Sequence, residues 1–182
     1  MRRLLLASAV LFALCASAAF GAQQHGQADT RSTQAAALKY LEGELQHYEQ
    51  TTWRWQRLVG ISPTQTAGRR LAAMGISDLE QTVKTWQRRA LAAHRRAQHP
   101  PHLAQWLCIH RYEGAWNDVG GPYWGGLQMD LTFQERYGGR LYRMKGTADH
   151  WTPLEQIWTA EKALRSTGFW PWPNTARMCG LI

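Results

Sequence analysis

A chain of 182 residues with 45% hydrophobic residues and ten tryptophans is too apolar to be disordered and long enough for one packed domain with an appendage. Its formal net charge of +8 favours anionic partners, and most of the basic surplus lies before residue 106. The basic residues are not interleaved with aromatic residues in a nucleic-acid-binding module, so we expect no nucleic-acid partner.

Residues 1–22 have the features of a signal peptide. A pair of arginines precedes an apolar run over residues 4–14, and small residues for cleavage follow. The run is too short to cross a bilayer, so we expect no stable membrane span, cleavage within residues 18–22, and a secreted protein of the cell wall. Lipidation of Cys15 is the alternative. Residues 23–31 are polar and predict a flexible leader.

Residues 32–101 are predicted to form an antiparallel helical hairpin. Apolar residues recur at alternating spacings of three and four over residues 38–59, and a similar stripe occupies residues 79–97. Gly60 and Pro100 mark the ends of these helices. We interpret the hairpin as an accessory element. Its paired arginines predict a solvated face, and binding of anionic wall polymers is the alternative function of this basic surface.

The segment over residues 106–128 places one carboxylate, Glu113, beside a glycine-rich turn. A helical pattern runs up to Glu113, and Gly114 stops it. A carboxyl group at this helix end, walled by aromatic rings, is poorly solvated. Poor solvation favours its protonated form, which can act as a proton donor. The expected wall consists of Trp116, Tyr123 and Trp124. A carboxylic acid in such a place can protonate the leaving oxygen of a glycosidic bond.

Two cysteines, Cys108 and Cys179, remain after removal of the signal peptide. In an exported protein, two cysteines most simply form one disulfide, which here ties the C-terminal tail to the helix of Glu113. A metal site that adds His110 and His150 is the alternative, although the spacing matches no zinc pattern. We therefore expect no metal and no other cofactor.

The remaining elements belong to a domain over residues 102–182. Residues 123–129 are predicted to form two short strands of an irregular hairpin. Asp130 is placed to cap a helix that ends at Gly138, and Thr152 begins a further helix through a capping box. The expected fold class is α+β and mostly helical, with a small domain preceded by the helical hairpin.

Several motifs follow one another in a recognisable order from residue 106 to residue 179. They are a Trp and a Cys before the Glu, a Gly and a Trp after it, Gly125-Gly126-Leu127-Gln128 after an aromatic pair, Tyr137-Gly138-Gly139, a helix with Glu155-Gln156-Ile157, and a closing Trp-Pro before a Cys. In this order the chain resembles the lysozyme-like transglycosylase domain of bacterial resuscitation-promoting factors. It differs from that family in having four residues between Cys108 and Glu113 and Gly114 after the Glu.

The resemblance implies a lysozyme-like fold, a peptidoglycan substrate and Glu113 as the single catalytic acid. Glycan contacts are expected from Trp116, Tyr123, Trp124, Gln128 and Trp158. Candidates for a second carboxylate are Asp118, Asp130 and Glu135, each with a plainer role in a turn, a helix cap or a helix surface. Glu155 and Glu161 are interpreted as charges at a helix start and on a helix surface, and a supporting contact from Glu161 to the site is the alternative.

The sequence thus predicts a secreted enzyme that breaks the bond between N-acetylmuramic acid and N-acetylglucosamine in peptidoglycan glycan strands, by lytic transglycosylation. Attack by water and attack by the sugar's own 6-hydroxyl both fit a single acid and base. The alternative function is a non-catalytic wall protein that binds or scaffolds glycan.

Overall fold

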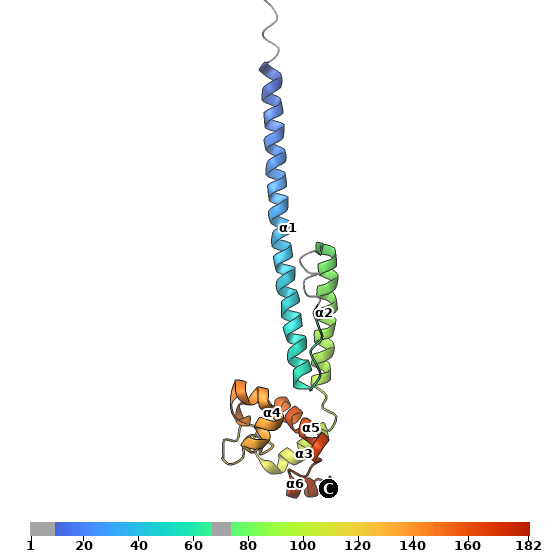
Figure 1. The fold of residues 1–182 in the computed structure, drawn as a ribbon, viewed down its shortest axis with the longest axis vertical. Coiled ribbons are helices and arrows are strands. Elements are labelled where there is room, and N and C mark those ends of the chain that lie inside the picture. Colours follow the sequence, from blue (N-terminus) through green and yellow to red (C-terminus); the bar gives the residue numbers. More distant parts are fainter. Residues whose placement is uncertain (1–9, 67–73) are drawn as a thin grey trace, which may run out of the picture. The chain divides into compact units, whose positions relative to one another are not determined.

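The computed structural model describes residues 10–66 and 74–182, with side chains from residue 29 onward within these ranges. The chain is mostly helical, as predicted (Figure 1). The predicted β part is wrong, because the described residues contain no named strand and only one isolated antiparallel bridge, between Trp124 and Met129. Gly125 and Gln128 both have positive φ, +74° and +47°, and the chain reverses between them too sharply for a longer ladder.

The described residues divide into two compact units. The second unit consists of Tyr48–Thr66 and Thr85–Ile182, and the remaining residues fall in the first. The second unit therefore contains residues from both sides of the domain boundary predicted at residues 101 and 102. It combines the ends of the two hairpin helices with the C-terminal domain.

Helices α1 (Val10–Leu58) and α2 (Ile76–Ala97) contain the two predicted apolar stripes. The stripe residues that are buried include Leu45, Thr52, Val59, Leu79, Val83, Trp86, Ala90 and Ala97. Because α1 begins at Val10, residues 23–31 are helical where a flexible leader was predicted. Residues 1–9 of the predicted signal peptide lie outside the described residues. Within the described part of the chain, none of the helices has a stretch both long and apolar enough to cross a membrane.

The C-terminal domain is built from helices α3 (Leu103–Glu113), α4 (Leu131–Lys145), α5 (Pro153–Thr167) and α6 (Pro173–Met178), with a short 3-10 helix at Ala148–His150. Helix α4 packs on α5, and α3 packs on α6. The core between them is made of Trp106, Ile109, Leu127, Met129, Ala148, Trp151, Ile157, Ala160, Trp172 and Ala176. Two of its members, Leu127 and Met129, come from the glycine-rich loop, so the core fixes that loop.

The start of α4 is confirmed and its predicted end is wrong. The side chain of Asp130 accepts a hydrogen bond from the N–H of Phe133, which is the expected N-cap. The helix then continues through Gly138 and ends at Gly146. Gly138 is required for packing rather than for termination, because a Cβ at this position would overlap the ring of Trp151. The capping box at the start of α5 is confirmed.

Glu49 of α1 is a buried carboxyl group whose Oε1 atom has no hydrogen-bond partner among the described residues. Burial raises the pKa of Glu49 above its ordinary value of 4.5. The folded state therefore favours the protonated form. The stability that it contributes is fully present below that ordinary value and is lost as the pH rises through the raised folded pKa.

We expect Glu49→Gln to weaken this pH dependence, because the amide is neutral at every pH. At neutral pH the variant is expected to be more stable than the native chain by about 1 kcal/mol, since no buried charge must be desolvated. Urea unfolding at a series of pH values from 4 to 8 measures both effects. Glu42→Gln on the exposed side of the same helix is the control. An unchanged pH dependence in Glu49→Gln would contradict the prediction.

Candidate active site

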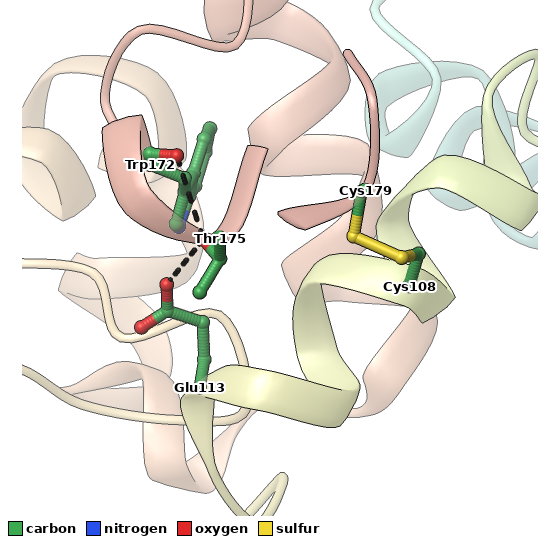
Figure 2. Close-up of a disulfide and its surroundings, with 5 residues drawn as sticks. All are labelled: Cys108, Glu113, Trp172, Thr175 and Cys179. Carbon is green, nitrogen blue, oxygen red and sulfur yellow. Dashed lines mark hydrogen bonds between the residues drawn. A yellow bond between two sulfur atoms is a disulfide. The ribbon is translucent and has the colours of Figure 1, made fainter. Parts of the chain in front are cut away.

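Glu113 is the last residue of α3, and its side chain is half-buried. The N–H of Gly114 donates to the carbonyl oxygen of His110, and the chain then leaves the helix, as predicted. One carboxylate oxygen of Glu113, Oε1, accepts a hydrogen bond of 2.7 Å from the hydroxyl of Thr175 in α6 (Figure 2). The other oxygen, Oε2, has no hydrogen-bond partner among the described residues. One oxygen is thus held by a hydrogen bond and the other is not.

The hydroxyl of Thr175 has a second neighbour, the carbonyl oxygen of Trp172 at 3.4 Å (Figure 2). A hydroxyl has one hydrogen and can also accept. It donates to Glu113 while the carboxylate is ionised. When Glu113 is protonated, Thr175 can accept from the carboxyl group and donate to Trp172 instead. This pair therefore accommodates both protonation states of Glu113 by rotation of one hydroxyl.

A disulfide joins Cys108 in α3 to Cys179 directly after α6, with 6.1 Å between their Cα atoms (Figure 2). This is the pairing that the sequence predicted. It holds α6, and with it Thr175, against the helix that ends at Glu113. The alternative metal site is not formed, because both thiols are in the disulfide. Within the described ranges no group of three or more His, Cys, Asp or Glu side chains is placed to hold a metal ion.

Removing the disulfide by the double substitution Cys108→Ser and Cys179→Ser is expected to lower the free energy of unfolding. The bond closes a loop between positions 71 residues apart, and chain-entropy models give ~4 kcal/mol for a loop of this order. Urea unfolding of the mature chain measures the loss, and the reduced native chain should match the double variant. Two titratable thiols in the folded, unreduced native chain would contradict the pairing.

Asp118 and Gln128 form a pair beside the end of α3. Asp118 Oδ2 accepts a hydrogen bond of 2.7 Å from Gln128 Nε2, and Oδ1 accepts one of 3.2 Å from the N–H of Gly120. A Cβ on Gly114 would lie 3.2 Å from Asp118 Oδ2, so the pair rests against the residue that follows Glu113. Of the three predicted second carboxylates, Asp118 is therefore placed next to the catalytic candidate in the fold.

The amide of Gln128 is oriented by its partners. Its second N–H is donated to the carbonyl oxygen of Gly125 at 2.9 Å, so both hydrogens of Nε2 are used inside the protein. Only Oε1 remains to meet a ligand, and it can accept but cannot donate. Gln128 also has a positive φ of 47°, which is uncommon for a residue other than glycine. The hydrogen bonds to Asp118 and Gly125 hold the side chain of Gln128 in place.

The other two carboxylates have the plainer roles that the sequence offered. Asp130 caps α4, and Glu135 lies exposed on the same helix.

The aromatic residues expected around Glu113 have different environments. The ring of Trp116 stacks on the imidazole of His110 with 3.8 Å between centroids, and His110 Nδ1 lies 3.0 Å from the carbonyl oxygen of Gly126. A carbonyl only accepts, so Nδ1 carries the hydrogen. Trp116 and Trp124 are half-buried and Tyr123 is 48% exposed.

Gly126 is needed for contact with the protein's own rings. A Cβ there would lie 2.6 Å from His110 Nδ1 and 2.7 Å from Trp116 Cε3, closer than such atoms can approach. Gly126 is therefore required by the packing of these two rings.

Trp158 does not fit its predicted role as a glycan contact. Its side chain is 5% exposed and packs in a cluster with Leu58, Val59 and Ala97. The indole N–H donates to the carbonyl oxygen of Ala97 at 2.7 Å. Trp158 is thus a core residue that joins α5 to the ends of the hairpin helices.

Gln156 in α5 has the most extensive side-chain hydrogen bonding near the glycine-rich loop, and the sequence assigned it no role. It is fully buried, and its Oε1 accepts from the N–H of Gly126 at 2.8 Å. Its Nε2 lies within hydrogen-bond distance of the carbonyl oxygens of Trp116, Ala148 and Trp151, at 2.7, 2.9 and 3.2 Å. The amide of Gln156 therefore fixes both the backbone of Trp116 and the glycine-rich loop at Gly126.

Glu161 is buried rather than exposed on the helix surface, and it braces the other end of α3. Its carboxylate accepts hydrogen bonds from the N–H of His102 at 2.8 Å and from the indole N–H of Trp106 at 3.0 Å. Since Glu161 is 5% exposed, these bonds are shielded from water. They fix where the helix of Glu113 begins.

Comparison with protein-family models, with curated proteins and with solved structures finds no match to this chain. The resemblance to the transglycosylase domain therefore stays a prediction from the motifs. What supports a function is the geometry of the residues described above.

Proposed function

We propose that this chain is a secreted, peptidoglycan-cleaving enzyme in which Glu113 is the single general acid and base. The carboxyl group of Glu113 carries this proposal, because one oxygen is held by Thr175 and the other has no partner among the described residues. A fixed carboxyl group with one available oxygen is what proton transfer to a leaving oxygen requires. The order of motifs shared with the transglycosylase domain supports peptidoglycan as the substrate.

The proposed reaction begins with proton transfer from Glu113 Oε2 to the oxygen between N-acetylmuramic acid and N-acetylglucosamine. The bond from C1 to that oxygen breaks, and positive charge develops on the muramic acid ring. Glu113, now ionised, takes a proton from the 6-hydroxyl of the same ring. The 6-oxygen bonds to C1 and gives an anhydro sugar without consuming water.

The surroundings of Asp118 support a mechanism with one carboxylate. Both of its oxygens accept hydrogen bonds within the loop, one from Gln128 and one from the N–H of Gly120. Asp118 therefore serves to hold the loop rather than to attack C1. Gln128 Oε1 is the group that we assign to accept a hydrogen bond from the N–H of the sugar's N-acetyl group.

The proposal is tested by incubating the mature chain, residues 23–182, with purified peptidoglycan and weighing the soluble fragments by mass spectrometry. Fragments lighter than hydrolysis products by one water establish lytic transglycosylation. Fragments with the mass of the hydrolysis products mean that water is the nucleophile. If no fragments form while the protein still sediments with the wall, the chain is a glycan-binding protein without this activity.

A further inference from the structure

A cavity lies in the same compact unit as Glu113, and Glu113 is not among the residues that line it. It has a volume of about 780 Å³ and lies between the last turns of α1, the second half of α4 and the start of α5. Neither Glu113 nor its partner Thr175 lines it. A cavity of this volume falls in the range of small-molecule sites. The proposed glycan chemistry does not use it.

The charge around this cavity is strongly unbalanced. Its basic lining residues are Arg54, Arg57, Arg140, Lys145 and Lys162, and Glu155 is its one acidic lining residue. The carboxylate of Glu155 is already paired with Lys145, with Nζ to oxygen distances of 2.7 and 2.8 Å. Among the described residues, the other four cations have no ion pair.

Two of these cations, Arg57 and Lys162, are partly shielded from water. Burial, and then the charge of Arg140, lowers the pKa of Arg57. Burial, and then the charge of Arg165, lowers the pKa of Lys162. Half-buried like charges without a counter-ion are costly, and an anion bound between them would remove that cost. Such an arrangement is typical of an anion site rather than of a packing surface.

The walls of the cavity are apolar. Side chains of Trp55, Leu141 and Met144 line it together with the basic residues. A small inorganic anion would satisfy the charges and leave this apolar surface exposed to water. A neutral apolar ligand would cover the surface and leave the cations without a partner. A ligand that has both an anionic group and an apolar chain satisfies both features.

We propose that this cavity binds an amphipathic anion, a phosphate or carboxylate head group carried on an apolar chain. Arg57, Arg140 and Lys162 hold the head group, and the chain lies along Trp55 and Leu141. The ligand is a single small molecule, in keeping with the volume of the cavity.

Isothermal titration calorimetry of the mature chain with dodecyl phosphate, below its micelle concentration, tests the proposal. Inorganic phosphate supplies the charge without the chain, and dodecyl maltoside supplies the chain without the charge. We expect dodecyl phosphate to bind at least about tenfold more tightly than either. Arg140→Gln and Lys162→Met should each weaken it by about tenfold, because one charge-assisted hydrogen bond is lost. The control is Arg143→Gln, an exposed residue of α4 outside the cavity, which should leave affinity unchanged.

Three results would overturn the proposal. The first is equal affinity for dodecyl phosphate and dodecyl maltoside, since the cations would then play no part. The second is equal affinity for dodecyl phosphate and inorganic phosphate, since the apolar walls would play none. The third is binding of polyglutamate or of anionic phospholipid vesicles with the expected dependence on Arg140 and Lys162, without binding of free dodecyl phosphate. In that case the basic residues serve a polymer or a membrane surface.

Discussion

Replacing Glu113 with glutamine is expected to lower the rate of glycan cleavage by about a thousandfold, within the range that general acid catalysis contributes. Glutamine has the shape of glutamate, and its carbonyl oxygen can still accept the hydrogen bond from Thr175. The fold and the position of the side chain are therefore kept. The amide, however, cannot protonate a leaving oxygen or recover a proton from the 6-hydroxyl. Release of soluble fragments from purified peptidoglycan, quantified by mass spectrometry, measures the loss.

A matched control separates catalysis from the loss of a negative charge. Glu135→Gln makes the same chemical change on the exposed face of α4, and cleavage should be unaffected. Wall sedimentation of Glu113→Gln should equal that of the native chain, because glycan contacts do not depend on the acidic proton. Cleavage by Glu113→Gln at the native rate would mean that another group is the acid, and Asp118 would then be examined first because it lies beside Gly114.

Those features that depend on local sequence were predictable. The apolar stripes of α1 and α2 follow from residue spacing, and the end of α3 at Glu113 follows from the glycine after it. The disulfide followed from a count of cysteines in an exported chain. Each of these needs information from only one segment or from composition.

Those features that depend on tertiary packing were not predictable. Thr175 is 62 residues from Glu113 in the sequence, and threonine in a short C-terminal segment carries no signal of its role. Gly138 has the sequence character of a helix stop, yet α4 continues through it, and the glycine is needed because the ring of Trp151 occupies the space that a side chain would fill. Trp158 has the character of a sugar-stacking residue, and only the position of Ala97 shows that its indole is used in the core.

Replacing Gln156 with leucine is expected to destabilise the second unit by about 5 kcal/mol, because the N–H of Gly126 and several carbonyl groups would lose their buried partner. Leucine has a similar volume, so the loss would come from hydrogen bonding rather than from a cavity. Urea unfolding followed by tryptophan fluorescence measures it. Gln87→Leu, on the exposed face of α2 in the same unit, makes the same change where water solvates the amide, and it should shift stability by less than about 0.5 kcal/mol.

The position of Gln156 also links stability to the candidate site. Its amide joins α5 to the carbonyl of Trp116 and to the loop at Gly126, whose own carbonyl fixes the ring of His110. At a temperature where Gln156→Leu remains folded, we therefore expect weaker glycan binding, since the stacked ring pair loses its support, while Glu113 keeps its bond to Thr175. A loss of stability below about 1 kcal/mol would show that water replaces the amide at little cost, and that the loop is held by Leu127 and Met129 in the core instead.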